Sequence, residues 1–348
     1  MLIGITIYYQ VVRMELELAG VLALGVSITF FGGLLFVNAI EYIGHRARWT
    51  GSFTGAVVSP LFTSIPELLM FLVALYIYGG VSGEKIGIGT LLGQPFMAAT
   101  IIFPVIFLVA LIGYIARRRV DMVLEVERNL VIPYILFTAI YPIVLLPMVP
   151  SLGSGKYVAG MVLLVLYFIY TYIMYRSRSL AMLEAEEAYL ARILRADSGL
   201  LRLLLASIQL LIAVLLIMIG SRMLVAGVDE ASKALEASPI ALAILITPLA
   251  GVLPESITAI IWAYKGKDTL AVAAMVGEKV LYSTIYPGIG LIVTSWALDL
   301  PSLVSVVIVE VVSLLILYHI FKGKLTPDVA LIGLAGYVGF AIYVIHIL

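Results

Sequence analysis

The sequence predicts an all-α integral membrane protein in which ten membrane-spanning helices form two inverted repeats of five. This prediction depends on three observations: the composition, the distribution of charge among the loops, and a motif that occurs once in each half. Of the 348 residues, 63% are hydrophobic and 12% are charged, and the mean hydropathy is +1.16. Soluble domains carry roughly 45–50% apolar and about 25% charged residues. The chain is therefore expected to lie within a lipid bilayer.

Ten apolar segments are long enough to cross a bilayer, which takes about 20 helical residues. Charged or polar residues separate them. The segments are 17–40, 52–78, 86–115, 130–150, 157–175, 201–227, 239–263, 270–297, 301–321 and 329–348. Residues 1–16 are expected to form an extracytoplasmic N-terminal tail, because they have neither a basic leader nor the small-residue cleavage site of a signal peptide.

Basic residues mark every second loop, starting with the first. The positive-inside rule places these loops in the cytoplasm and both termini on the outside of the cell membrane. These loops contain Arg46 and Arg48; Arg117, Arg118, Arg119 and Arg128; Arg176, Arg178, Arg192, Arg195 and Arg202; Lys265 and Lys267; and Lys322 and Lys324. An odd number of helices per half makes the two halves inverted, which is common in secondary transporters.

The predicted organisation has a first five-helix repeat over 17–175 and a second over 201–348. Residues 176–200 form the linker between them, on the cytoplasmic side. Its alternating charged residues and leucines indicate an amphipathic helix at the membrane surface.

One motif occurs in both halves. PLFTSIPEL (60–68) recurs as PLAGVLPES (248–256), and each copy places prolines and a carboxylate, Glu67 or Glu255, inside an apolar segment. A charge near the bilayer centre costs at least about 2.5 kcal/mol, and proline removes a helix hydrogen bond. A buried charge and a proline at matching positions of two inverted halves therefore predict a cation site at the membrane midplane.

The residue types around the motif are those that bind hard cations. Pro60 and Pro66 free backbone carbonyls that lipid cannot satisfy. Thr63 and Glu67 are four residues apart and share one helix face, so a hydroxyl, a carboxylate and free carbonyls lie together, as Ca²⁺ or Na⁺ requires. In the second copy, Gly251 offers only its backbone oxygen.

The repeat continues into the next helix of each half. GQPFMAATI (93–101) aligns with GEKVLYSTI (277–285), so Gln94 and Glu278 occupy equivalent positions and are both expected to point into the central cavity. Pro95 is expected to break the third helix, and Gly277 with the Glu278–Lys279 pair the eighth. With the prolines of the repeated motif, helices two, three, seven and eight are all predicted to be broken.

Together with GGLLFVNA (32–39) and GSRMLVAG (220–227), the TSIPE sequence at 63–67 resembles the sodium/calcium exchanger family of the calcium/cation antiporter superfamily. The resemblance extends from about residue 17 to the end of the chain. It implies two inverted five-helix halves, an alternating-access antiport of Ca²⁺, and a divalent ion held by Glu67 and Glu255. It also implies that Thr63 and Ser64 are hydroxyl and carbonyl ligands.

The sequence departs from the family pattern at several positions. Gly251 and Val252 replace the Thr-Ser of the second motif, and Ala98 and Tyr282 replace amide or carboxyl ligands. Several Na⁺ ligands of the family are therefore missing. The counter-ion to Ca²⁺, or to another divalent cation, is accordingly left open between Na⁺ and H⁺.

An alternative assigns the missing sodium sites to charged residues. In this hypothesis, Glu278 and Lys279 replace bound Na⁺, and the protein is a proton-coupled or Mg²⁺/Mn²⁺-selective exchanger. Lys279 would reduce the −3 charge of Glu67, Glu255 and Glu278 to −2, which balances one divalent ion. Glu310, in the middle of helix nine, is expected to pair with Arg222 or Lys279. A cation channel is a less favoured alternative.

Composition excludes several other classes of function. The chain has no cysteine, hence no disulfide or thiolate metal site, and its zero formal net charge gives no support for nucleic-acid binding. His45, His319 and His346 lie far apart, so they are not expected to share a metal. No catalytic motif is present, so we expect neither an enzyme nor a covalently bound cofactor. The expected partners are inorganic cations and the lipid bilayer, and the sequence is compatible with a monomer.

Overall fold

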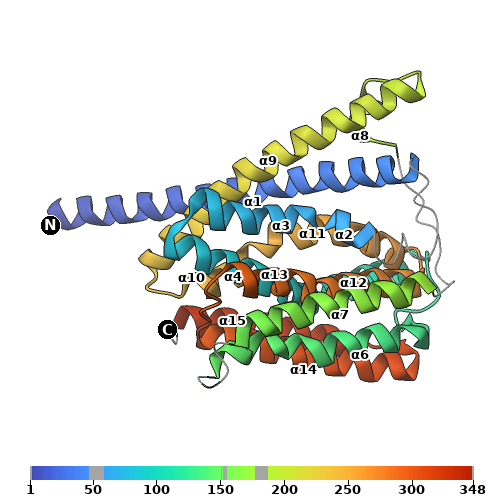
Figure 1. The fold of residues 1–348 in the computed structure, drawn as a ribbon. Coiled ribbons are helices and arrows are strands. Elements are labelled where there is room, and N and C mark those ends of the chain that lie inside the picture. The colour runs from blue at the N-terminus through green and yellow to red at the C-terminus, as the bar shows by residue number, and fades with distance from the viewer. Residues whose placement is uncertain (1, 47–58, 150, 152–154, 177–186, 347–348) are drawn as a thin grey trace.

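The computed structural model describes residues 2–46, 59–149, 151, 155–176 and 187–346. Its long helices lie side by side in one bundle, and the two chain ends lie at the same end of it (Figure 1). Eight helical stretches in these residues are long and apolar enough to cross a membrane, and a shorter apolar helix covers 156–172. The all-helical membrane fold is confirmed.

Five predicted segments are uninterrupted helices. They are α1 (Leu2–Arg46), α7 (Lys156–Arg176), α9 (Gly199–Ala234), α14 (Leu300–Lys322) and α15 (Asp328–His346). Since α1 begins at Leu2, the residues predicted as a tail instead extend the first helix.

The other five segments are interrupted or change helix type. The second consists of α2 (Ser59–Thr63), α3 (Ile65–Leu72) and a π-helix (Val73–Tyr78), and the third of α4 (Gly80–Met97), a π-helix (Ala98–Ile102) and α5 (Phe103–Ile115). The fourth consists of α6 (Val131–Ile140) between 3-10 turns (Arg128–Leu130 and Tyr141–Met148). The seventh consists of α10 (Pro239–Ile246) and α11 (Pro248–Tyr264), and the eighth of α12 (Asp268–Ser283) and α13 (Ile285–Val293).

Two of the predicted helix breaks are wrong. The third helix continues through Pro95 and widens into a π-turn over Ala98–Ile102, an adjustment by which membrane helices accommodate proline. The eighth continues through Gly277 and Lys279 and breaks later, at Thr284, whose φ and ψ are −124° and −79°. The second and seventh helices are interrupted near their prolines, at Ser64 and Thr247.

The first and sixth helices, α1 and α9, run along one face of the bundle (Figure 1). Their backbones approach closely at small residues. A Cβ on Gly25 would lie 2.8 Å from the amide nitrogen of Leu224, and one on Gly220 would lie 2.4 Å from Oγ1 of Thr29. Small residues of this kind allow membrane helices to pack backbone to backbone.

A short helix of the predicted linker, α8 (Tyr189–Ile193), is attached to this pair. The Oδ1 of Asn38 on α1 accepts a hydrogen bond from the Tyr189 amide at 2.8 Å, and Oε1 of Gln209 on α9 accepts one from the Leu190 amide at 2.8 Å. Asn38 also accepts from Nε2 of Gln209 at 2.9 Å. Linker residues 177–186 lie outside the described residues, so the full extent of the predicted amphipathic helix is not tested.

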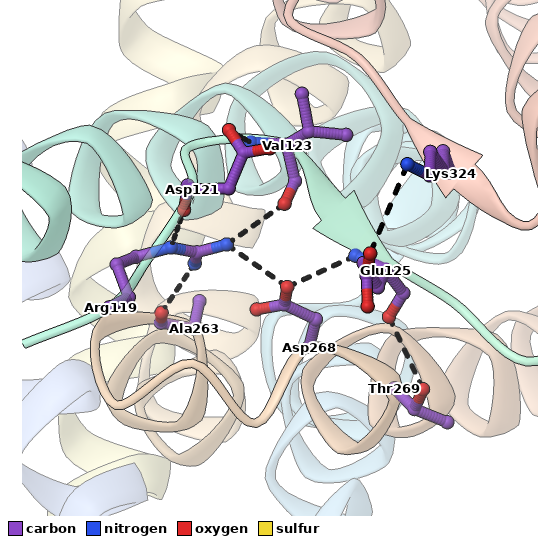
Figure 2. A network of polar contacts seen from close by, with 8 residues as sticks. All are labelled: Arg119, Asp121, Val123, Glu125, Ala263, Asp268, Thr269 and Lys324. Carbon is purple, nitrogen blue, oxygen red and sulfur yellow. Dashed lines mark hydrogen bonds and ion pairs between the residues drawn. The ribbon is translucent and has the colours of Figure 1, made fainter.

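A network of polar contacts between Arg119, Glu125 and Asp268 joins the two halves (Figure 2). Arg119 donates to the carboxylate of Asp268 at 3.0 Å, and to the carbonyls of Ala263 at 2.7 Å and Val123 at 3.1 Å. The amide of Glu125 donates to Asp268 at 3.0 Å. Next to this network, strand β1 (Leu124–Glu125) pairs antiparallel with β2 (Lys324–Leu325). A first-half loop thus holds the end of α11 and the start of α12.

Candidate cation-binding site

Three carboxylates from both halves gather in the bundle interior. Glu67 on α3 is fully buried, and Glu255 on α11 and Glu278 on α12 are each 6% exposed. The charges of Glu67 and Glu255 act on each other, and the charge of Glu278 acts on those of the other two carboxylates. The structure therefore brings together the two glutamates of the repeated motif, which are far apart in the sequence.

Most oxygens of this group have no hydrogen-bond partner. Both carboxylate oxygens of Glu67 lack one, as do Oε1 of Glu255 and Oε2 of Glu278. Buried polar atoms in proteins are nearly always hydrogen-bonded, so this set is unusual. Unpartnered buried acceptor oxygens are of the kind that bind a hard cation, but no three His, Cys, Asp or Glu side chains among the described residues are arranged as ligands of one metal ion.

Gly251 makes room for the Glu67 carboxylate. A Cβ at residue 251 would lie 2.5 Å from Oε1 of Glu67 and 2.9 Å from Cε of Met70. The carboxylate of Glu67 in the first motif therefore occupies the space that a side chain at position 251 of the second motif would fill. The predicted role of the Gly251 carbonyl as a ligand stays a prediction.

Two tyrosines of the second half contact the site. Tyr282 donates a hydrogen bond to Oε2 of Glu255. Tyr286 donates to the carbonyl of Ser64 at 2.6 Å and lies 2.8 Å from its Oγ. The rings are 5.8 Å apart, and both side chains are buried. The sequence pattern predicts only a lost ligand at Tyr282 and assigns no role to Tyr286. The signal for their contacts with the site is the spacing of two tyrosines four residues apart in one apolar segment.

The model of the family described as sodium/calcium exchanger protein matches residues 17–176 and 205–346, which is most of the chain. The chain belongs to the sodium/calcium exchanger family. No curated protein matches the exchanger's sequence significantly.

Solved structures share its fold at low sequence identity. The H⁺/Ca²⁺ exchanger CAX is 18% identical with a TM-score of 0.69, and the match covers 97% of this chain and 85% of CAX. YfkE is 17% identical with a TM-score of 0.64, covering 94% and 91%. The sodium-calcium exchanger NCX_Mj is 18% identical with a TM-score of 0.55, covering 92% and 96%.

Two further predicted ligands, Gln94 and Thr63, are buried in the structure. Gln94 is fully buried on α4, and neither its amide nitrogen nor its oxygen has a hydrogen-bond partner. Its neighbour Gly93 packs against the start of α11, where a Cβ would lie 2.5 Å from Cγ of Pro248. Thr63 is buried at the end of α2. Their ligand roles remain predictions.

The structure does not bring Lys279 to the carboxylates. Its amine donates to the hydroxyl of Tyr134 on α6 at 2.9 Å and lies over three aromatic rings. Glu310 acts electrostatically on this amine, but the described residues show no direct ion pair between them. The hypothesis that the amine of Lys279 occupies a sodium position among the carboxylates therefore finds no support in its placement.

Proposed function

We propose that this exchanger moves Ca²⁺ across the membrane in exchange for protons, and that the ion binds between Glu67 and Glu255. The observation that carries the proposal is a pair of buried carboxylates, one from each half, with three of their four oxygens unpartnered. Glu67 lies against Gly251, one helical turn before Glu255. Two carboxylates balance the charge of one divalent ion. Thr63, Ser64, Gly251 and Gln94 are the further oxygen ligands in this proposal. The side-chain oxygen of Gln94 has no hydrogen-bond partner, whereas the oxygens of Ser64 are bonded to Tyr286 and would have to exchange that contact for the ion.

The residues available for a second ion favour protons over Na⁺. The family's amide positions are occupied here by Ala98 and Tyr282, and Tyr282 presents a donor to Glu255 rather than an acceptor to a cation. Protons need only the carboxylates, and adjacent carboxylates in a low-dielectric interior cannot both stay charged without a cation. Binding of Ca²⁺ and of protons at Glu67, Glu255 and Glu278 is therefore mutually exclusive, which is the requirement for exchange.

The proposal includes the arrangement of the chain in the cell membrane. Residues 17–175 and 201–348 form inverted repeats, the basic loops face the cytoplasm, and both chain ends lie outside. The two chain ends at one end of the bundle support this (Figure 1). A cysteine introduced at Lys322 should react with impermeant thiol reagents only from the cytoplasmic side, and one introduced at Leu16 only from outside.

The counter-ion is tested by Ca²⁺ uptake into proteoliposomes under separately imposed gradients. An outward H⁺ gradient should drive uptake, and an outward Na⁺ gradient at constant pH should not. Uptake that follows Na⁺ and ignores pH would overturn proton coupling, while uptake without any counter-ion would indicate a channel. Competition by Mg²⁺ and Mn²⁺ in the same vesicles measures divalent selectivity, and Mg²⁺ or Mn²⁺ binding more tightly than Ca²⁺ would overturn the choice of ion.

A further inference from the structure

The amine of Lys279 lies in a fully enclosed aromatic pocket. Its Nζ is 5.0 Å from the ring centre of Phe137, 5.1 Å from that of Tyr134 and 5.3 Å from that of Phe103. The Tyr134 hydroxyl accepts a hydrogen bond from it at 2.9 Å. All four side chains are fully buried. Aromatic faces at this distance attract a cation, and the attraction is strongest where water is excluded.

This pocket connects the two halves of the exchanger. Phe103 belongs to α5, and Tyr134 and Phe137 belong to α6, so its walls come from the first half. The lysine comes from α12 in the second half, and the carboxylate that acts on it, Glu310, comes from α14. Helix α12 packs against α6, and α6 packs against α14. The amine thus attaches α12 to first-half helices that carry none of the candidate cation ligands.

Helix geometry couples this pocket to the cation site. Successive residues of an α-helix point about 100° apart around its axis. Lys279 faces α5 and α6, so its neighbour Glu278 points to another side of α12, a helix that also packs against α11, which carries Glu255. Because both lie on one continuous helix, a rotation that withdraws Lys279 from the aromatic rings also turns Glu278 away from Glu255.

We propose that Lys279 is a positioning residue, whose amine, enclosed by Phe103, Tyr134 and Phe137, fixes the rotation of α12 and thereby the orientation of Glu278 relative to Glu255. Lys279 does not bind the transported ion. The consequence for exchange rests on the proposed function, in which Glu278 contributes to ion binding.

A double-mutant cycle measures this coupling. Lys279→Met should raise the KM for Ca²⁺ about tenfold when Glu278 is present, and no more than about twofold in a Glu278→Gln background, because coupled residues give non-additive effects. Lys279→Arg should restore most of the loss, since guanidinium also binds aromatic faces. Equal losses in both backgrounds, or no loss in either, would overturn the proposal. Lys324→Met, at a lysine whose side chain is 61% exposed, is the matched control and should leave KM unchanged.

A second measurement does not depend on transport. The chain has no natural cysteine, so Glu278→Cys introduces the only thiol, and its reaction rate with a small methanethiosulfonate reports the orientation of α12. Lys279→Met should change that rate at least about threefold, as expected for a rotated helix face. Tyr134→Phe keeps the ring and removes only the acceptor hydroxyl, so it should change the labelling rate by a smaller factor. This variant replaces Lys279→Met in the test if Lys279→Met does not fold.

The two measurements separate the possible failures. An unchanged labelling rate in both variants would overturn the positioning role. A changed rate in a protein that does not exchange Ca²⁺ would keep the positioning role and overturn the proposed function.

Discussion

The two copies of the repeated motif fold differently around their glutamates. In the first copy, the helix stops at Thr63, and Ser64 adopts a non-helical turn with φ and ψ of −93° and 10° before α3 begins at Ile65. In the second copy, the interruption falls just before the motif, at Thr247, which keeps helical angles of −64° and −36°. Helix α11 therefore runs unbroken through Gly251 to Glu255.

This difference decides where the backbone oxygens of each copy are used. In the first copy, the open turn exposes the carbonyl of Ser64, which accepts a hydrogen bond from Tyr286 in the other half. At the aligned position of the second copy, the carbonyl of Val252 accepts from Oγ of Ser256 at 2.7 Å, within its own helix. The first half thus uses a backbone carbonyl for a contact between the halves, whereas the second contributes space at Gly251, a third carboxylate at Glu278 and the phenol of Tyr282.

The largest effect is expected for the glutamate that the two copies of the motif have in common. Glu67→Gln and Glu255→Gln should each lower Ca²⁺ affinity about 100-fold, because each removes a charged interaction worth about 3 kcal/mol. Isothermal titration of purified protein with Ca²⁺ measures this. Glu236→Gln, at an exposed position, is the control. A normal affinity in either site variant would show that only one copy binds the ion.

The next prediction tests the space that only the second copy provides. Gly251→Ala places a Cβ 2.5 Å from Oε1 of Glu67, so the carboxylate must move. Ca²⁺ affinity should fall about 30-fold, since overpacking a filled interior costs about 2 kcal/mol. Gly20→Ala adds the same methyl group to α1 where nothing lies within 4 Å, and it should leave transport unchanged. Equal behaviour of the two variants would contradict a role for Gly251 in placing Glu67.

A third variant makes the two halves more alike. Glu278→Gln gives the second half the residue that the first half has at Gln94. Removing a charge that interacts through the protein interior should reduce Ca²⁺ affinity about tenfold, or about 1.4 kcal/mol. The number of protons exchanged per Ca²⁺, measured with a pH dye inside proteoliposomes, should fall as well. An unchanged proton number would remove Glu278 from the exchange reaction.

The smallest expected effect separates the two tyrosines. Tyr282→Phe removes the hydroxyl that orients Glu255 and should raise the KM for Ca²⁺ about fivefold, the value of one hydrogen bond of about 1 kcal/mol. Tyr286→Phe removes the contact to Ser64 and should lower the melting temperature, with less than about a twofold change in KM. If the effects on KM are reversed, the Ser64 carbonyl is the more important ligand.

Local features explain why much of the fold could be predicted. Each of the ten apolar segments corresponds to helical structure wherever the chain is described, because hydropathy acts on each segment separately. The bounds fit least well in α1, which starts at Leu2 rather than at 17, and in α9, which ends at Ala234 rather than at 227. The helix breaks were harder to predict. Pro95 does not interrupt its helix, whereas the eighth helix is interrupted at Thr284, three residues before Pro287. A proline shows where a hydrogen bond is lost, but the surrounding helices decide whether the helix bends, widens or stops.

The sequence by itself determined the membrane class, the family and the two glutamates that meet in the interior, since composition and a repeated motif can be read directly from residue order. Only the tertiary structure decided that Gly251 makes room for Glu67, that Tyr282 and Tyr286 reach the site, and that Lys279 faces away from it. These outcomes depend on helix rotation, in which one residue changes the direction of a side chain by about 100°. They also depend on contacts such as Ser64 with Tyr286, whose partners lie 222 residues apart.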